Sequence, residues 1–150
     1  MKAKNIMTPN PKCCTPEASL QSVARMMCDC NCGEIPVIES EQTMKPIGVI
    51  TDRDITCRAV ALGKNPLRLK VQDCMTKPAV TVSLDASLQE CCQLMERKQI
   101  RRVPVVDQTG RCCGIVAQAD IAKHASEHEV AECLKELSEQ TGTSSLATSA

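Results

Sequence analysis

A hydroxyl and a carboxylate stand three residues apart at Thr51 and Asp54, with the cation Arg53 between them. They follow an apolar run that ends at Ile50, where a helix is expected to begin. The first turn of a helix offers unpaired N–H groups and a partial positive charge, which suit a phosphate. Thr51 could add a hydroxyl, Arg53 a charge, and Asp54 acceptors for two ribose hydroxyls. The same spacing is that of a capping box, which needs no ligand, so both interpretations stay open.

Thiols form a second set of reactive groups, because the chain has 12 cysteines. Cys28, Cys30 and Cys32 form a Cys-x-Cys-x-Cys pattern, and soft thiolates of this kind bind zinc or copper(I) or act as redox switches. The pattern lacks the paired Cys-x-x-Cys spacing of structural zinc sites. We therefore predict no metal site, and a thiol-based metal or redox sensor at these three cysteines stays an alternative.

Two histidines, His124 and His128, are one helical turn apart and could chelate a metal together. Glu127, Glu129 and Glu132 surround them, which indicates a solvated helix face instead. The sequence shows no nucleophile paired with a base, no glycine-rich phosphate loop and no catalytic pair of carboxylates in a recognisable setting. We predict that the protein is not an enzyme and requires no cofactor.

Composition argues against several classes of partner. The 18 basic and 18 acidic side chains balance, which argues against binding to duplex DNA or to an anionic membrane. The chain has no Phe, Tyr or Trp and so lacks the aromatic platform of single-strand nucleic-acid binders. No apolar stretch reads as a signal peptide or a membrane span. We expect a cytoplasmic protein whose cysteines are mainly reduced thiols.

An internal repeat organises the elements that must position these residues. Met7-Thr8 recurs as Met75-Thr76, 68 positions later, and the same offset aligns matching residues as far as Val37. Beyond that point the first copy holds two extra residues, so that Asp54 matches Asp120 at an offset of 66. The fold is therefore expected to consist of two copies of one supersecondary unit.

Each copy predicts the element order β-α-β-β-α. A short extended piece precedes Ser19 or Ser87, both good helix N-caps, and apolar residues then recur on one helical face. Two β-type runs follow, and then a second helix. In the first copy this helix begins at Asp52 and ends at Gly63; in the second it begins near Gln118 and runs to about residue 137. Such helices must bury one face on a small sheet, so the predicted fold class is α/β (α+β).

The domain boundaries follow from the repeat. We predict a first repeat at residues 1–66 and a second at residues 67–137, the latter with an extended C-terminal helix. Residues 138–150 are rich in Ser, Thr, Ala and Gly without apolar periodicity, which predicts a disordered tail.

The repeat also separates core cysteines from surface cysteines. Cys28 and Cys30 align with Glu96 and Lys98, which predicts exposure. Six others align with an apolar residue of the other copy, which predicts burial as small hydrophobic side chains. These six are Cys14, Cys32, Cys74, Cys91, Cys92 and Cys113.

The order of the motifs resembles the cystathionine-β-synthase (CBS) repeat. The first copy carries Ile6-Met7-Thr8, Ile35-Pro36-Val37-Ile38 and Gly48-Val49-Ile50-Thr51-Asp52-Arg53-Asp54-Ile55. The second carries Cys74-Met75-Thr76, Arg102-Val103-Pro104-Val105-Val106 and Gly114-Ile115-Val116-Ala117-Gln118-Ala119-Asp120-Ile121. Each motif alone is weak, but their order, found twice over about residues 5–125, is highly specific.

The resemblance implies two repeats packed by their sheets around a pseudo-twofold axis, with two clefts between them, in a module (a Bateman module) that forms a homodimer. Such pairs commonly bind AMP, ADP, ATP or S-adenosylmethionine and pass the signal to a partner. The resemblance also implies which residues contact the ligand. They are Thr15, Ile35, Pro36, Thr51, Arg53, Asp54, Ser83, Arg102, Val103, Pro104 and Asp120.

The two copies differ at one of these positions. Ala117 stands in the second copy where Thr51 stands in the first, while Asp120 remains. Alanine cannot hydrogen-bond a phosphate through its side chain. The second cleft is therefore either empty or weak, or it depends on Arg102, Ser83 and backbone groups, and we predict that the first cleft is the stronger site.

The predicted function is a non-catalytic regulatory module that binds an adenosine-containing ligand and signals to an unknown protein in trans. Two alternatives stay open. One is the thiol-based metal or redox sensor on the same scaffold. The other is a structural dimerisation module with vestigial clefts, which Ala117 favours.

Overall fold

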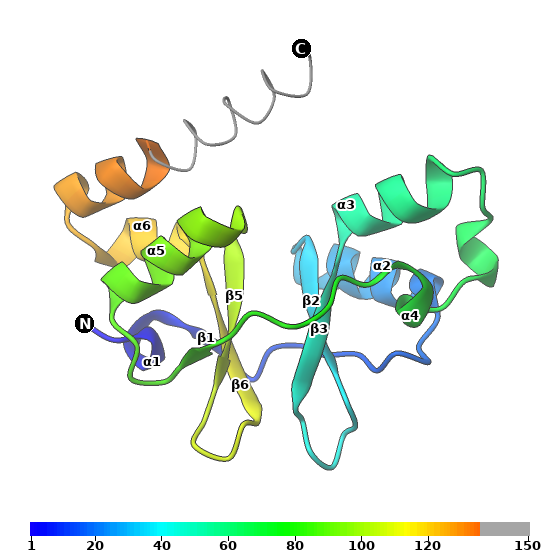
Figure 1. Ribbon diagram of the computed structural model, residues 1–150, viewed down its shortest axis with the longest axis horizontal. Coiled ribbons are helices and arrows are strands. Elements are labelled where there is room, and N and C mark those ends of the chain that lie inside the picture. Colours follow the sequence, from blue (N-terminus) through cyan, green and yellow to red (C-terminus); the bar gives the residue numbers. More distant parts are fainter. Residues whose placement is uncertain (136–150) are drawn as a thin grey trace.

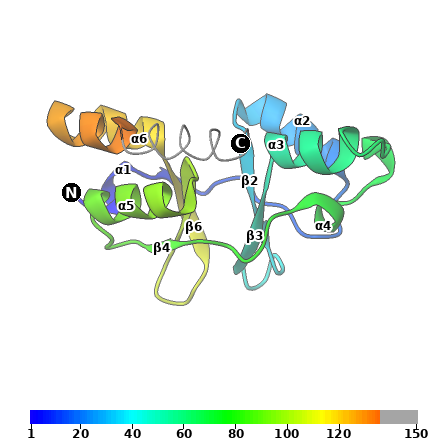
Figure 2. The same cartoon turned by 45° about the horizontal axis from the view of Figure 1, so that its top comes forward.

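The computed structural model describes residues 1–135, and they form two similar halves side by side (Figure 1). In the first half, strands β2 (Glu34–Ile38) and β3 (Pro46–Thr51) form an antiparallel hairpin. Helices α2 (Leu20–Cys30) and α3 (Asp52–Ile55) lie beside it, as both ribbon views show (Figure 2). The predicted fold class is confirmed.

The second half repeats this arrangement. Strands β5 (Arg102–Val106) and β6 (Cys112–Ala117) pair antiparallel, and the short β4 (Val82–Ser83) pairs with β5 in parallel. Helices α5 (Leu88–Lys98) and α6 (Gln118–His124) lie beside this sheet. Short elements complete the described chain: α1 (Ala3–Ile6), β1 (Thr8–Pro9), the π-helix η1 (Thr56–Val60), the 3-10 helix η2 (Pro66–Arg68) and α4 (Val71–Cys74).

The first helix of each repeat begins at its predicted cap. The Ser19 hydroxyl accepts a hydrogen bond from the Ser22 N–H at 3.1 Å. Ser87 and Glu90 form a reciprocal capping box, with N–H to oxygen distances of 2.9 and 3.1 Å. A cap of this kind stabilises a helix by about 1 kcal/mol, so local sequence fixes where α2 and α5 begin.

The second helices differ from the prediction in one respect. In the first repeat the helical run continues from α3 through η1, and Gly63 adopts the left-handed conformation expected of a helix stop, with φ +73°. In the second repeat the predicted extended helix is divided: α6 ends at His124 and residues 127–135 form another helical segment. Ser126 caps that segment, because its hydroxyl accepts from the Glu129 N–H at 3.2 Å. The predicted helix end near residue 137 and the predicted tail lie outside the described residues.

The N-terminal segments of the two repeats are exchanged between the halves. Strand β1 pairs with β6, and α1 hydrogen-bonds to the second half, with Ala3 N–H donating to the Ala86 carbonyl at 2.7 Å. Conversely, α4 packs on the first half, where the Val71 N–H donates to the Ala18 carbonyl at 2.8 Å. Thr76 then pairs with Val49 of β3. Figure 1 shows the linker that follows α4 crossing back to the second half.

Each core therefore includes the exchanged N-terminal segment of the other repeat. The first core contains Val23 and Ile50 together with Val71 and Cys74 of α4. The second contains Met95, Val103 and Val116 together with Ala3 and Ile6 of α1. Burying apolar side chains from the exchanged segments ties the halves together, since neither core closes without them.

The two hairpin tips also touch. The Cys112 N–H donates to the Met44 carbonyl at 2.8 Å, and Arg111 Nη1 donates to the Gln42 carbonyl at 2.6 Å. These bonds hold the halves together at the end opposite to the starts of α3 and α6. Within residues 1–135, no helix is long and apolar enough to cross a membrane.

Candidate ligand cleft

The start of α3 is held by Thr51 and Asp54. The Thr51 Oγ1 accepts from the Asp54 N–H, and the Asp54 Oδ2 accepts from the Thr51 N–H, both at 3.0 Å, which confirms the predicted capping box. The other carboxylate oxygen, Oδ1, accepts from the Thr76 hydroxyl at 3.0 Å and lies 3.9 Å from Nε of Arg58. A ribose hydroxyl that binds Asp54 would share this oxygen with the Thr76 hydroxyl or take the place of that hydroxyl. The ligand role of Asp54 therefore stays a prediction.

The equivalent site in the second repeat is incomplete. The Asp120 Oδ2 accepts from the Ala117 N–H at 2.8 Å, as in the first repeat. The side chain of Ala117 has no acceptor for the Asp120 N–H, so no side-chain cap forms. The structure thus preserves the asymmetry that the sequence shows between the two copies.

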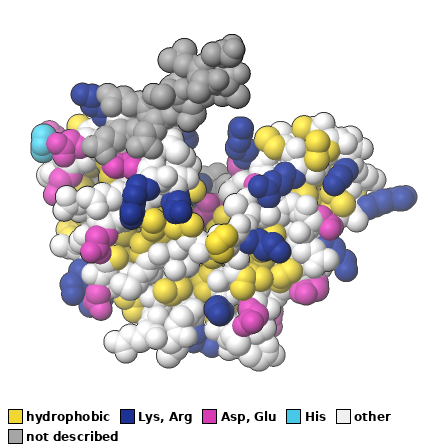
Figure 3. All heavy atoms as spheres, in the orientation of Figure 1, with side chains coloured by type: hydrophobic (Ala, Val, Ile, Leu, Met, Phe, Trp, Pro, Cys, Tyr) yellow, Lys and Arg dark blue, Asp and Glu magenta, His cyan; other side chains and the backbone are white. Residues whose placement is uncertain are grey.

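A groove of about 590 Å³ lies beside the start of α3. It is lined by a charged residue from each repeat, Asp52 from the first and Arg102 from the second. Its lining residues are Ala24, Met27, Cys28, Asn31, Cys32, Gly33, Asp52, Ile55, Thr56 and Arg102. The volume falls within the range of small-molecule sites. Figure 3 shows the surface notched between the two halves, with basic and acidic side chains around the notch.

Of the predicted site residues, Arg102 lines this groove, and it comes from the second repeat. It brings a guanidinium, which recognises phosphate or carboxylate groups, to a groove otherwise built by the first repeat. Gly33 makes room for the carboxylate of Asp52, because a Cβ at Gly33 would lie 2.8 Å from the Asp52 Oδ2. Sequence reasoning missed both Gly33 and Asp52; the first-turn position of Asp52, next to Arg53, was the available signal.

A buried carboxyl lies at the first position of β2. Glu34 is 8% exposed, and its Oε2 has no hydrogen-bond partner among residues 1–135. Burial raises the pKa of Glu34 to about 7; the positive charge of Arg102 opposes this shift and the negative charge of Asp54 adds to it. Glu34 was also missed, although the repeat aligns it with Arg102. The two strands therefore begin with opposite charges.

The structure does not bring all the predicted residues together. Thr15 lines a groove of about 540 Å³ with Ile38, at the end of β2 opposite to Thr51. Ser83 lines the equivalent groove of about 350 Å³ with Val106. Both are therefore remote from the groove that contains Arg102.

The remaining predicted residues divide by exposure. The side chain of Arg53 is exposed on the first turn of α3. Four residues are fully buried within their strands, where they shape the sheets and present no free surface to a ligand. They are Ile35, Pro36, Val103 and Pro104.

The cysteines largely follow the repeat comparison. Cys14, Cys74 and Cys91 are buried, Cys32 and Cys113 are half-buried against the cores, and Cys28 and Cys30 are exposed. Cys92 is also half-buried against the second core, but it forms a disulfide with Cys133, which the repeat comparison did not predict. Alignment within the repeat could not reveal this bond, since Cys133 lies beyond the repeated region.

The alternative metal site at Cys28, Cys30 and Cys32 is not assembled. Cys30 lines a different groove from Cys28 and Cys32. Across the part of the chain that the structure describes, the group of three or more metal-binding side chains with converging atoms is Cys92, Glu96 and Cys133. His128 is exposed and lies 3.3 Å from Glu132, in line with a solvated helix face.

Comparison with known proteins identifies the family. The CBS domain profile matches residues 3–59 and again residues 71–127. The chain belongs to the CBS domain family, as a tandem pair.

Its relatives include YlbB of Bacillus subtilis, 36% identical over 140 residues, 92% of each chain. Hypoxic response protein 1 of Mycobacterium tuberculosis is 32% identical over 133 residues, 89% of this chain and 91% of that protein. The chain spans about half of another relative, MK0525 of Methanopyrus kandleri, with 36% identity over 71% of this chain and 54% of that one. It also matches 22% of the length of inosine-5'-monophosphate dehydrogenase of Bacillus subtilis, so the family includes enzymes that carry such repeats.

Solved structures agree with this assignment. Hypoxic response protein I, with two coordinated zinc ions, superimposes with a TM-score of 0.76 at 32% identity, over 84% of this chain and all of that one. The CBS pair of MJ0100, in complex with 5'-methylthioadenosine and S-adenosylmethionine, gives a TM-score of 0.72 at 28% identity, over 82% and 94% of the two chains. CBSX2 in complex with AMP gives 0.69 at 26%, over 83% and 95%.

Proposed function

We propose that this CBS pair is a non-catalytic regulatory module that binds an adenosine-containing ligand between its repeats. The observation that carries the proposal is the groove of about 590 Å³ in which Arg102 of the second repeat faces the α2 and α3 ends of the first. A ligand held by both repeats stabilises one relative arrangement of them, and a regulatory signal requires such differential affinity. The MJ0100 and CBSX2 complexes, with S-adenosylmethionine and AMP, support an adenosine compound as the ligand class.

We further propose that the protein acts in the cytoplasm as a homodimer and signals to a separate protein. The support is the family: CBS-CP12, a neighbour with a TM-score of 0.75 at 26% identity over 86% of this chain and 73% of that one, is hexameric. Among the described residues Val60, Leu62 and Leu67 are large apolar side chains left exposed beside α3, η1 and η2. Such side chains are suited to burial against another protein surface.

The first repeat is proposed to hold the stronger site. Thr51 and Asp54 are ordered there by their mutual hydrogen bonds, and Asp54 carries a second oxygen that faces the Thr76 hydroxyl. Asp120 lacks the threonine partner. We propose that the ribose hydroxyls bind this Asp54 oxygen, either sharing it with the Thr76 hydroxyl or taking the place of that hydroxyl. Asp54 is not among the lining residues of the groove that contains Arg102, so the proposal requires the ligand to extend from that groove to the start of α3.

Isothermal titration of the reduced protein with AMP, ADP, ATP, 5'-methylthioadenosine and S-adenosylmethionine tests the proposal. We expect one compound to bind, Asp54→Ala to weaken it at least tenfold, and Asp120→Ala, the matched variant of the other repeat, to change affinity less than threefold. Because Asp54→Ala also removes a cap worth about 1 kcal/mol, its fold is checked by thermal unfolding before titration. Reversal of the two variants would reject the first cleft, and no binding by any compound would favour a structural dimerisation module.

A further inference from the structure

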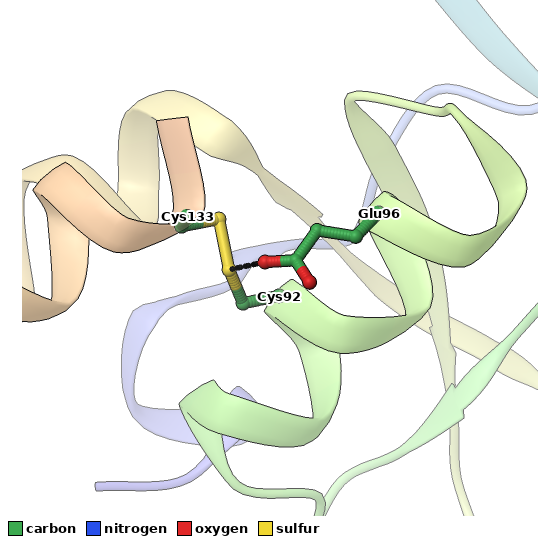
Figure 4. Close-up of side chains that lie close together, drawn as sticks. All are labelled: Cys92, Glu96 and Cys133. Atoms are coloured by element: carbon green, nitrogen blue, oxygen red, sulfur yellow. Dashed lines mark hydrogen bonds between the residues drawn. A yellow bond between two sulfur atoms is a disulfide. The ribbon is translucent and has the colours of Figure 1, made fainter. Parts of the chain in front are cut away.

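The C-terminal helical segment 127–135 is joined covalently to α5 by the disulfide between Cys133 and Cys92. Glu96 lies one turn beyond Cys92 on α5, and its carboxylate points at the sulfur pair (Figure 4). The Glu96 Oε1 lies 3.2 Å from the Cys92 Sγ. Cys133 is 3% exposed and Glu96 9% exposed, so these groups meet in a largely buried place.

Once the disulfide is reduced, the three groups can take the spacing of ligands around a tetrahedral metal ion. Their donor atoms all lie within 4.8 Å of one another. Zinc binds sulfur at about 2.3 Å and carboxylate oxygen at about 2.0–2.2 Å; tetrahedral angles then put two sulfurs about 3.8 Å apart and a sulfur and an oxygen about 3.5 Å apart. The Cα atoms of the two cysteines are 6.1 Å apart, so the reduced sulfurs can reach this spacing by side-chain rotation.

The surroundings favour a cation. A cavity of about 150 Å³ adjoins the three groups, and Glu129 and Glu132 also line it. No lysine, arginine or histidine is among the described residues that line this cavity. The carboxylates of Glu96, Glu129 and Glu132 line this cavity, and Glu132 also lies 3.3 Å from the His128 Nε2. Such a concentration of acidic groups attracts a divalent ion, and the space admits water or one more carboxylate as the fourth ligand.

We propose that the reduced Cys92–Cys133 pair and Glu96 form a binding site for a thiophilic divalent cation, of which Zn²⁺ is the representative. The disulfide and the metal are alternative links between α5 and segment 127–135. Two low-molecular-weight thiols open the site by thiol–disulfide exchange: they supply two electrons and two protons to Cys92 and Cys133 and leave joined as a disulfide. The cation then displaces the two thiol protons as it binds.

This site gives the thiol-sensor alternative a place in the molecule other than the predicted Cys28, Cys30 and Cys32. It does not depend on the adenosine ligand, because its residues belong to α5 and segment 127–135 and its lining shares none with the groove that contains Arg102. The two proposals can therefore fail separately.

The test uses the full chain, reduced with a phosphine that is itself oxidised to the phosphine oxide with oxygen from water. Zn²⁺ is titrated anaerobically in competition with a chromophoric chelator, and Co²⁺ is added in parallel to detect thiolate–metal charge-transfer absorption. We expect one tight equivalent of Zn²⁺, at least a hundredfold weaker binding in Cys133→Ser, and at least tenfold weaker binding in Glu96→Gln. Re-forming the disulfide with an oxidised low-molecular-weight disulfide is expected to remove the tight equivalent.

Cys28→Ser is the matched control, because the repeat places Cys28 where the second copy has Glu96. It is expected to keep the tight equivalent. Retention of full affinity in Cys133→Ser, loss of it in Cys28→Ser, or equal binding by the disulfide form would each overturn the proposal. Glu96→Gln preserves the shape of the side chain, so it decides the question even if the serine variant folds poorly.

Discussion

Replacing Glu34 by glutamine is the most informative single change outside the proposed metal site. Glu34 begins β2 and is buried, yet its Oε2 has no hydrogen-bond partner among the residues that the structure describes. Glutamine keeps the size of the side chain and removes the ionisation. The substitution therefore separates the charge of Glu34 from its packing.

The magnitude follows from the pKa. Burial raises the pKa of Glu34 from 4.5 to about 7 in the folded protein, a shift opposed by Arg102 and assisted by Asp54. Between these two pH values the folded state binds more protons than the unfolded state, so the free energy of unfolding falls as pH rises. A shift of about 2.5 pH units at about 1.4 kcal/mol per unit gives a loss of about 3 kcal/mol by pH 8. Below about pH 4.5 Glu34 is protonated in both the folded and the unfolded state, so none of this stability is lost.

Urea unfolding of the wild-type protein and of Glu34→Gln, from pH 4.5 to pH 8, measures this loss. We expect the free energy of unfolding of the variant to rise relative to that of the wild type by about 2–3 kcal/mol from pH 4.5 to pH 8. The part of the difference between the two proteins that changes with pH reports the ionisation of Glu34, whereas a part that is constant with pH reports packing. Glu17→Gln, at an exposed position, serves as the control and is expected to show no such trend.

A difference between Glu34→Gln and wild type that stays constant within about 0.5 kcal/mol from pH 4.5 to pH 8 would refute the reasoning. It would mean that the carboxyl titrates near its ordinary pKa and that water reaches it. A trend of the opposite sign would mean that Arg102 dominates over burial.

Two pairs of substitutions test the repeat. Thr51→Ala should lower the free energy of unfolding by about 1 kcal/mol, and Ala117→Thr should raise it by up to about 1 kcal/mol, because the first removes a helix cap and the second creates the equivalent one. Chemical denaturation measures both changes, and no effect of either would show that these caps do not stabilise the protein. Gly48→Ala should cost about 1–3 kcal/mol, since its Cβ would lie 2.5 Å from the Thr76 carbonyl oxygen. The equivalent Gly114→Ala should cost less in thermal unfolding, because it meets a flexible methionine side chain rather than backbone, and the reverse order would contradict the packing described.

Parts of the candidate site were predictable because their signals are local. The Thr51–Asp54 box forms within one helical turn, and a spacing of three residues is enough to specify it. Arg102 was recognised through its place in a repeated motif, and it does line the groove. Thr15 and Ser83 were assigned through the resemblance alone, and the structure places them at the far ends of β2 and β5.

Sequence by itself determined the two repeats, the order of their helices and strands, the caps at Ser19 and Ser87, and the division between core and surface for most cysteines. These features depend on periodicity and on contacts within a few residues. The pattern in one copy can also be checked against the pattern in the other. Tertiary structure alone decided three others. The exchange of α1 and α4 between the halves, the burial of Glu34 beside Arg102, and the meeting of Cys92 with Cys133 each join segments far apart in sequence. Such pairings are selected by the packing of whole elements, which no local pattern encodes.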